Sequence, residues 1–168
     1  YQGAVGTGRA PSLVVDGDTS HNDNKYFVVG NAQPQEKNET KPVNPTYWIQ
    51  LDLGKKYSLT EMKLFVYHGR ALKNLVVLAS DSSTFDTYSI IWNADKENFF
   101  GLGAGDKEQF PNATVAGDTI TLAAPTEAQY VRILNNGHTA GAGQGAHYFE
   151  IEVYGTEHTG GAPETTLY

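Results

Sequence analysis

Several features common in other classes of protein are absent from this sequence, and each absence removes a class of function. The chain of 168 residues has no cysteine, which excludes a disulfide framework and thiol chemistry. No stretch approaches the roughly 18 consecutive apolar residues of a membrane-spanning helix. Asp and Glu outnumber Lys and Arg by 19 to 12, and the net charge of -7 disfavours nucleic acids and anionic membranes as partners. Neutral sugars and cations remain compatible partners.

The motifs of common catalytic centres are missing as well. The sequence has no Gly-x-Ser-x-Gly nucleophile elbow and no His-Glu-x-x-His zinc motif. The glycine-rich stretch 101–106 has Asp106 where a dinucleotide-binding loop needs its third glycine, and no helical pattern follows it. Glu150 and Glu152 share one face of a predicted strand, as the carboxylates of a glycosidase could. Glu150 has a better explanation as a metal ligand, so we predict no intrinsic enzymatic activity.

The sequence does contain a series of strand patterns separated by turn residues. Apolar and polar residues alternate from Tyr47 to Leu53, where Gly54 is expected to end the strand. Residues 75–79 are continuously apolar, which predicts a strand buried on both faces. Other predicted strands are 62–67, 88–92, 119–122, 130–134 and 149–154, with a surface loop at 31–45. This pattern predicts one all-β sandwich domain over residues 1–155, followed by a disordered linker or tail at 156–168.

Three segments of the sequence form a recognisable combination. They are the loop Val15-Asp16-Gly17-Asp18-Thr19, the strand Thr46 to Gly54, and the closing strand Phe149-Glu150-Ile151-Glu152-Val153-Tyr154-Gly155. Together they resemble the discoidin family, also called coagulation factor 5/8 type C domains. The resemblance covers roughly residues 5–155 and is closest to the bacterial sugar-binding branch, carbohydrate-binding module family 32. It implies a jelly-roll β-sandwich of the galactose-binding-like type and a non-catalytic module that binds galactose-type or related glycans.

The resemblance also implies a structural Ca²⁺ site. Asp16, Asp18 and Ser20 are spaced like the first ligands of an EF-hand. His21 and Phe27 then occupy the positions where an EF-hand needs glycine and a closing acid, so an EF-hand is excluded. In the sugar-binding branch, a similar loop and a glutamate near the C-terminus hold the ion, with backbone carbonyls as further ligands. The implied ligands are Asp16, Asp18, His21, Phe149 and Glu150; the alternative is an Asp-Gly turn with solvated carboxylates.

The implied sugar site lies on loops at one end of the sandwich. Arg70 follows a strand beside Gly69, and its planar fork of donors can span two adjacent sugar hydroxyls. The resemblance matches Arg70 to a sugar-binding arginine, and Asn74 more loosely to a sugar-binding asparagine. Loops 21–27 and 135–148 add aromatic rings that can stack on a pyranose and histidines that can bond to hydroxyls. The candidate ligand-binding residues are His21, Tyr26, Arg70, Asn74, His138, His147 and Tyr148.

Plainer explanations exist for these residues. Arg70 could pair with a surface carboxylate, Asn74 could begin the next strand, and Tyr148 could pack against the sandwich edge. For the whole protein, a protein or cell-surface adhesion module and a free-standing glycan-active enzyme stay open as alternatives. The chain begins at Tyr1 rather than Met, so we expect a piece of a larger protein. A glycan-binding role further implies a secreted or cell-surface location and attachment to other domains, such as a glycoside hydrolase.

Overall fold

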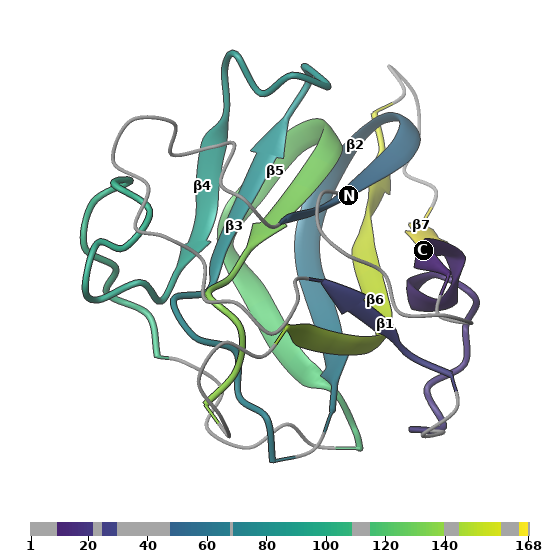
Figure 1. Ribbon diagram of the computed structural model, residues 1–168. Helices are drawn as coiled ribbons and strands as arrows, with labels where there is room; N and C mark the ends of the chain where they lie inside the picture. The colour runs from purple at the N-terminus through teal and green to yellow at the C-terminus, as the bar shows by residue number, and fades with distance from the viewer. Residues whose placement is uncertain are drawn as a thin grey trace.

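The fold is built almost entirely from antiparallel strands (Figure 1). The computed structural model describes residues 10–21, 25–29, 48–67, 69–108, 115–139, 145–158 and 165–167. Within these ranges, no helix is long and apolar enough to cross a membrane. The hydrogen-bonded order of the strands is β1-β6-β2-β5-β3-β4, with β7 on the outer side of β6. The elements are η1 (Pro11–Val14), β1 (Phe27–Val29), β2 (Trp48–Val66), β3 (Val76–Ser80), β4 (Ser89–Asn93), β5 (Asp118–Leu134), β6 (Ala146–Glu157) and β7 (Thr165–Leu167).

Two of the strands are long and bent, which corrects the shorter strands predicted from the sequence. Gly54 does not end a strand: it lies inside β2 with φ +81°, at a shift in register between Asp52 and Tyr57. A glycine adopts this backbone conformation without the strain that a Cβ would cause, so the strand bends and continues. In β5, Pro125 lies where the ladder to β2 is interrupted, so its missing N–H removes no hydrogen bond. The predicted strands 47–54 and 62–67 are therefore one element, as are 119–122 and 130–134.

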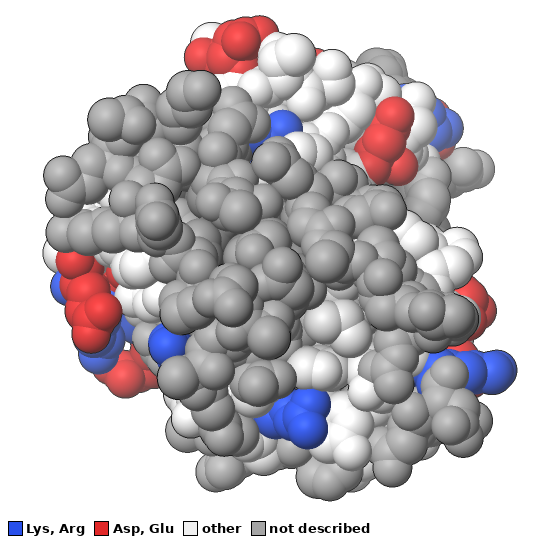
Figure 2. Space-filling model, in the orientation of Figure 1, with Lys and Arg blue, Asp and Glu red and all other residues white. Residues whose placement is uncertain are grey.

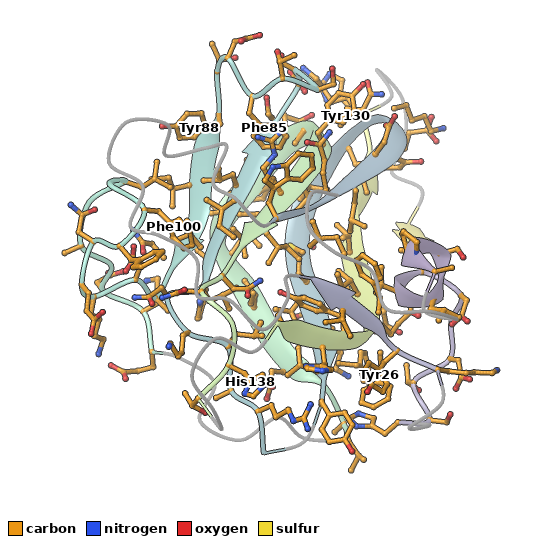
Figure 3. The ribbon with its side chains drawn as sticks, viewed as in Figure 1. Tyr26, Phe85, Tyr88, Phe100, Tyr130 and His138 are labelled. Atoms are coloured by element: carbon orange, nitrogen blue, oxygen red, sulfur yellow. The ribbon has the colours of Figure 1, made fainter. Side chains whose placement is uncertain are left out.

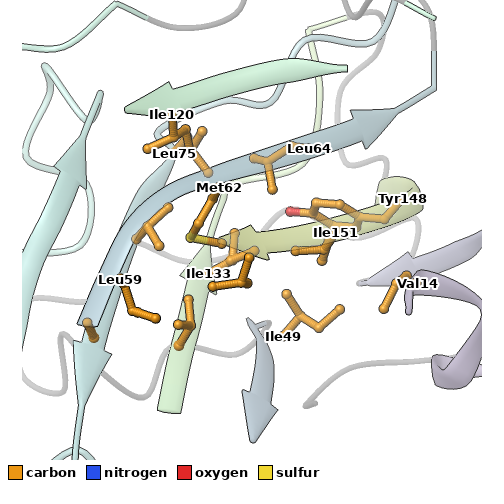
Figure 4. Packing of buried hydrophobic residues seen from close by; sticks show 14 of the residues in the cluster. Val14, Ile49, Leu59, Met62, Leu64, Leu75, Ile120, Ile133, Tyr148 and Ile151 are labelled. Carbon is orange, nitrogen blue, oxygen red and sulfur yellow. The ribbon is translucent and has the colours of Figure 1, made fainter. Parts of the chain in front are cut away.

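These bends allow the sheet to enclose the main hydrophobic core (Figure 4). The core includes Val14, Ile49, Leu59, Met62, Leu64, Leu75, Ile120, Ile133, Tyr148 and Ile151. In β3, Val77 faces this core, whereas Val76 and Leu78 belong to a second apolar cluster on the other face. The prediction that 75–79 is buried on both faces is confirmed. The predicted fold, an all-β galactose-binding-like jelly-roll sandwich, is confirmed as well.

The second apolar cluster is closed by a buried cation. Arg132 is 2% exposed, and its guanidinium carbon lies 4.4 Å from the ring centre of Trp48 and 4.0 Å from that of Phe85. Its Nε and Nη2 atoms both donate to the side-chain oxygen of Gln50, at 3.0 and 2.6 Å. Trp48 thus has a structural position in β2.

At the C-terminus the structure differs from the predicted disordered tail. Residues 165–167 form β7, which pairs with Tyr154, Gly155 and Thr156 of β6. Pairing with β6 gives these residues backbone hydrogen bonds within the protein, in place of the bonds to water that a solvated tail would make. It also extends the sheet beyond residue 155. The predicted loop at 31–45 lies outside the described residues.

Asp118, the first residue of β5, provides a test of pH-dependent stability. Its Oδ2 atom is buried without a hydrogen-bond partner among the described residues. Burial raises the pKa of Asp118 from 3.8 to about 6. Ionisation of Asp118 therefore lowers the free energy of unfolding. This destabilisation is absent below pH 3.8, increases between pH 3.8 and about 6, and is fully present at higher pH.

We therefore expect Asp118→Asn to raise the melting temperature at pH 8 by about 2–4 °C, the equivalent of about 1 kcal/mol in a domain of this size. Near pH 4 the two proteins should melt together, because there the wild-type carboxyl is largely neutral when folded. Thermal melts from pH 4 to 8 test this. A difference in melting temperature that does not change with pH would contradict it.

Candidate functional site

The loop that follows β2 is held in place by backbone hydrogen bonds to two other segments. Tyr67 N donates to the carbonyl of His147 at 3.0 Å, and Arg70 N donates to the carbonyl of Tyr67 at 3.1 Å. Further along, Lys73 N donates to the carbonyl of Gly137 at 3.0 Å. The loop 67–74 is thus fastened to β6 on one side and to the segment 136–139 on the other. These bonds bring together residues that lie some 80 positions apart in the sequence.

Arg70 is the centre of the group that results. Its guanidinium carbon lies 4.3 Å from the ring centre of Tyr67, and its Nη1 atom lies 3.1 Å from Nε2 of His147. Because arginine only donates, Nε2 of His147 accepts, and the imidazole proton lies on Nδ1. The ring of His147 is 5.1 Å from that of Tyr26 and 5.5 Å from that of His138. Figure 3 shows Tyr26 and His138 at the same end of the sandwich.

Phe149 forms the floor beneath these rings. It is 1% exposed, and its ring stacks against Tyr67 with centres 5.7 Å apart and planes inclined by 22°. The rings of His21 and Tyr26 also pack on it, at 4.5 and 5.8 Å. The structure therefore brings five predicted site residues, His21, Tyr26, Arg70, His138 and His147, to one place.

The sequence patterns did not indicate a site role for Tyr67, and they implied only a backbone role for Phe149. A signal for Tyr67 was present, because it continues the alternation of β2 on the face opposite Leu64 and Val66, which are both in the core. In the folded protein, Tyr67 positions Arg70 through a cation–π contact.

Two predicted ligand-binding residues are corrected by the structure. Tyr148 is fully buried in the main core, where Figure 4 shows it among aliphatic side chains, so its ring cannot stack on a sugar. Its hydroxyl contacts Nδ2 of Asn135 at 2.8 Å, and burial raises its pKa well above the ordinary value. Asn74 is 4% exposed, with φ +52°, and its Nδ2 donates to Oδ1 of the buried Asp95 at 2.8 Å. Both residues hold the loops in place and do not face a ligand.

Two cationic side chains, Arg70 and Lys73, affect the imidazole of His138. Burial lowers the pKa of His138, and the positive charges of Arg70 and Lys73 lower it further, so His138 is neutral at pH 7. In the view of Figure 2, Lys or Arg atoms show at the lower centre of the surface.

The predicted metal ligands lie on the loop after η1 and on β6. Glu150 is only 2% exposed, and its Oε2 accepts a hydrogen bond of 3.1 Å from Gly17 N. Burial raises the pKa of Glu150 to about 7, and the adjacent charge of Asp16 also raises it. Two carboxylates therefore lie close together in a partly dehydrated position, which a hard cation would stabilise.

The other predicted metal ligands contribute less than expected. Hydrogen bonds from the side chain of Ser20, from Ser20 N at 3.0 Å and from Lys25 Nζ at 3.1 Å lower the pKa of Asp18 to about 2, so its carboxylate is already engaged by these donors. The ring of His21 packs on Phe149, which leaves the backbone carbonyl as the donor that His21 could supply. Among the described residues, no cluster of three or more His, Cys, Asp or Glu side chains could hold a metal ion. The donors that fit Ca²⁺ are thus the two carboxylates of Asp16 and Glu150, together with backbone oxygens.

Several solved structures have a fold similar to that of this chain. A family 89 glycoside hydrolase from Clostridium perfringens has a similar fold over 99% of this chain, with 20% identity and a TM-score of 0.62. The chain spans only 15% of that enzyme's length. The CBM32-1 module of a family 31 glycoside hydrolase from the same organism is 16% identical over 90% of this chain and 88% of its own, with a TM-score of 0.61.

A third similar structure is chitosan-binding module 1 from the chitosanase/glucanase of Paenibacillus sp. IK-5. It is 22% identical over 89% of this chain and 88% of its own, with a TM-score of 0.56. At such low identities, these likenesses show the fold. A search of curated proteins found no significant match. Residues 4–151, however, match the F5/8 type C domain over most of the chain, and this confirms the resemblance stated from the sequence. The chain therefore belongs to the F5/8 type C domain family.

Proposed function

We propose that this domain is a non-catalytic carbohydrate-binding module that binds a galactose-type or related glycan at the loop end of the sandwich. The observation that carries the proposal is the fixed position of Arg70. Tyr67 and His147 hold its guanidinium, and the half-buried ring of Tyr26 lies beside it. A planar fork of donors suits two adjacent hydroxyls, and an aromatic face suits the C–H groups of a pyranose.

The similar structures support this role without fixing the glycan. Modules from two glycoside hydrolases share the fold, and one similar structure is described as chitosan-binding. We infer that this domain likewise belongs to a larger secreted or cell-surface protein. Its effect there would be to raise the effective concentration of a catalytic neighbour at the glycan.

We also propose a structural Ca²⁺ held by Asp16 and Glu150 with backbone oxygens from the same two segments. The support is the pair of carboxylates, one of them buried, at the contact between the loop after η1 and β6. When bound, the ion would supply the positive charge that these carboxylates lack. It would thereby fasten the first loop to the last long strand.

A glycan array with the purified domain tests the proposed function. We expect binding to galactose-containing glycans, with an affinity near 0.1–1 mM, or about 5 kcal/mol, because few groups contact the sugar. Titration followed by NMR should then confirm each array signal in solution. If a broad array gives no signal, the domain is instead a protein-binding adhesion module.

A further inference from the structure

The positive charges beside the proposed glycan site differ from the other cations of the molecule. Elsewhere in the described ranges, most lysines contact a carboxylate: Lys25 with Asp18, Lys55 with Glu157, Lys56 with Asp81, Lys96 with Glu108 and Lys107 with Asp106. Arg70 and Lys73 form no ion pair with any described residue. A protein with net charge -7 has ample carboxylates, so two unpaired cations on one short loop need an explanation.

The two cations act on the same place. Both lower the pKa of His138, so both charges act on this imidazole. Asn74 of the same loop binds the carboxylate of Asp95, which is 0% exposed. Its oxygens accept from Asn74 Nδ2 at 2.8 Å and Phe100 N at 2.9 Å, so they are already occupied inside the protein. Asp95 is therefore not available to pair with Arg70 or Lys73.

Arg70 retains the donors that an anion needs. Of its five side-chain N–H groups, the contact with His147 uses one, at Nη1. Stacking on Tyr67 fixes the plane of the guanidinium, so the remaining donors are held in one orientation. Such a fixed fork binds carboxylates or sulfates through paired, charge-assisted hydrogen bonds, which are stronger than bonds to neutral hydroxyls.

We propose that the glycan bound at this site is anionic, with a uronic acid carboxylate or a sulfate ester facing Arg70 and Lys73. This proposal rests on the proposed function and specifies its ligand class. The overall negative charge would repel an acidic polymer, and two neighbouring cations offset that repulsion where the polymer binds.

Matched pairs of ligands that differ only in charge test the proposal. Calorimetric or NMR titrations would compare oligogalacturonate with its methyl ester, and a sulfated galactan oligosaccharide with its desulfated form. We expect the anionic member of at least one pair to bind at least tenfold more tightly at low salt. A difference within the first pair would indicate that the site binds a carboxylate, and a difference within the second pair would indicate a sulfate. In 0.5 M salt the advantage should shrink severalfold, because exposed charges are then screened.

Two lysine variants test whether the charge of Lys73 contributes to the preference for an anionic ligand. Lys73→Gln should lower the affinity for the anionic ligand severalfold more than the affinity for its neutral counterpart, because the substitution removes a charge. Lys56→Gln, which alters a cation paired with Asp81, is the matched control and should change neither. Melting curves would show that both variants fold.

The outcomes separate this proposal from the proposed function. If neutral and anionic members bind equally, and binding depends on Arg70, glycan binding stands and the anionic proposal is wrong. The proposal is equally wrong if the anionic advantage is the same in Lys73→Gln as in the wild type. If no glycan of either kind binds, the proposed function itself fails and this proposal fails with it.

Discussion

Replacing Arg70 with alanine should abolish detectable glycan binding while the domain stays folded. Two charge-assisted hydrogen bonds contribute about 1.5–3 kcal/mol each, which is a large part of the roughly 5 kcal/mol expected for the whole interaction. The side chain is half-buried and packs on Tyr67 and His147, and we expect its removal to lower the melting temperature by no more than about 2–4 °C. Titration of a glycan identified on the array, together with a melting curve, measures both effects.

Arg70→Lys provides the companion variant. It keeps the positive charge and loses the planar fork, so we expect binding that is weakened about tenfold or more but not abolished. Lys56→Ala, at a surface cation that is paired with Asp81, is the control for a change of net charge. Wild-type affinity in Arg70→Ala would show that the site lies elsewhere on the domain.

Removal of Ca²⁺ should lower the melting temperature of the wild-type domain by about 5–10 °C. Binding of an ion to the folded state at about 100 times its dissociation constant adds about 2.7 kcal/mol, and each kcal/mol corresponds to about 2–4 °C in a domain of this size. The effect should be large because Glu150 is buried and the charge of Asp16 acts on it, so loss of the cation leaves these two negative charges uncompensated. Differential scanning fluorimetry with added Ca²⁺ or excess chelator measures it.

Glu150→Gln is the decisive variant for the metal site. Its amide keeps the shape of the side chain and removes the charge, so chelator should no longer change its melting temperature. Asp106→Asn alters an exposed carboxylate in a loop away from both η1 and β6, and it should keep the full response to chelator. An unchanged wild-type melting curve in excess chelator would contradict the proposed site.

Much of the fold follows from local patterns that the sequence displays. The continuous apolar run at 75–79 predicts a strand buried on both faces, and Val76 and Val77 do lie in two different clusters. The bend at Gly54 was not predictable in the same way. A glycine either ends a strand or bends it, and the choice depends on whether β5 continues to pair beyond it.

In the candidate site, too, the sequence predicts part of the arrangement of the side chains, and the tertiary structure decides the rest. Alternation along β6 predicts that His147 and Phe149 face one side and Tyr148 the other, but it does not say which side is the core. A shift in register then breaks the alternation, because Phe65 pairs with Glu150 whereas the next residue, Val66, pairs with Tyr148. As a result, Tyr148 and Ile151 both enter the core although they lie three positions apart.

The amino-acid sequence by itself determined the class of fold, the family and the residue types available for sugar and metal binding, because these depend on periodicity and on short motifs. The tertiary structure decided which of those residues share a site. Arg70, His138 and His147 meet because backbone hydrogen bonds join loops far apart in the chain. Whether a cation has a partner, or a ring faces water, depends on the segments packed beside it, and no local pattern records those contacts.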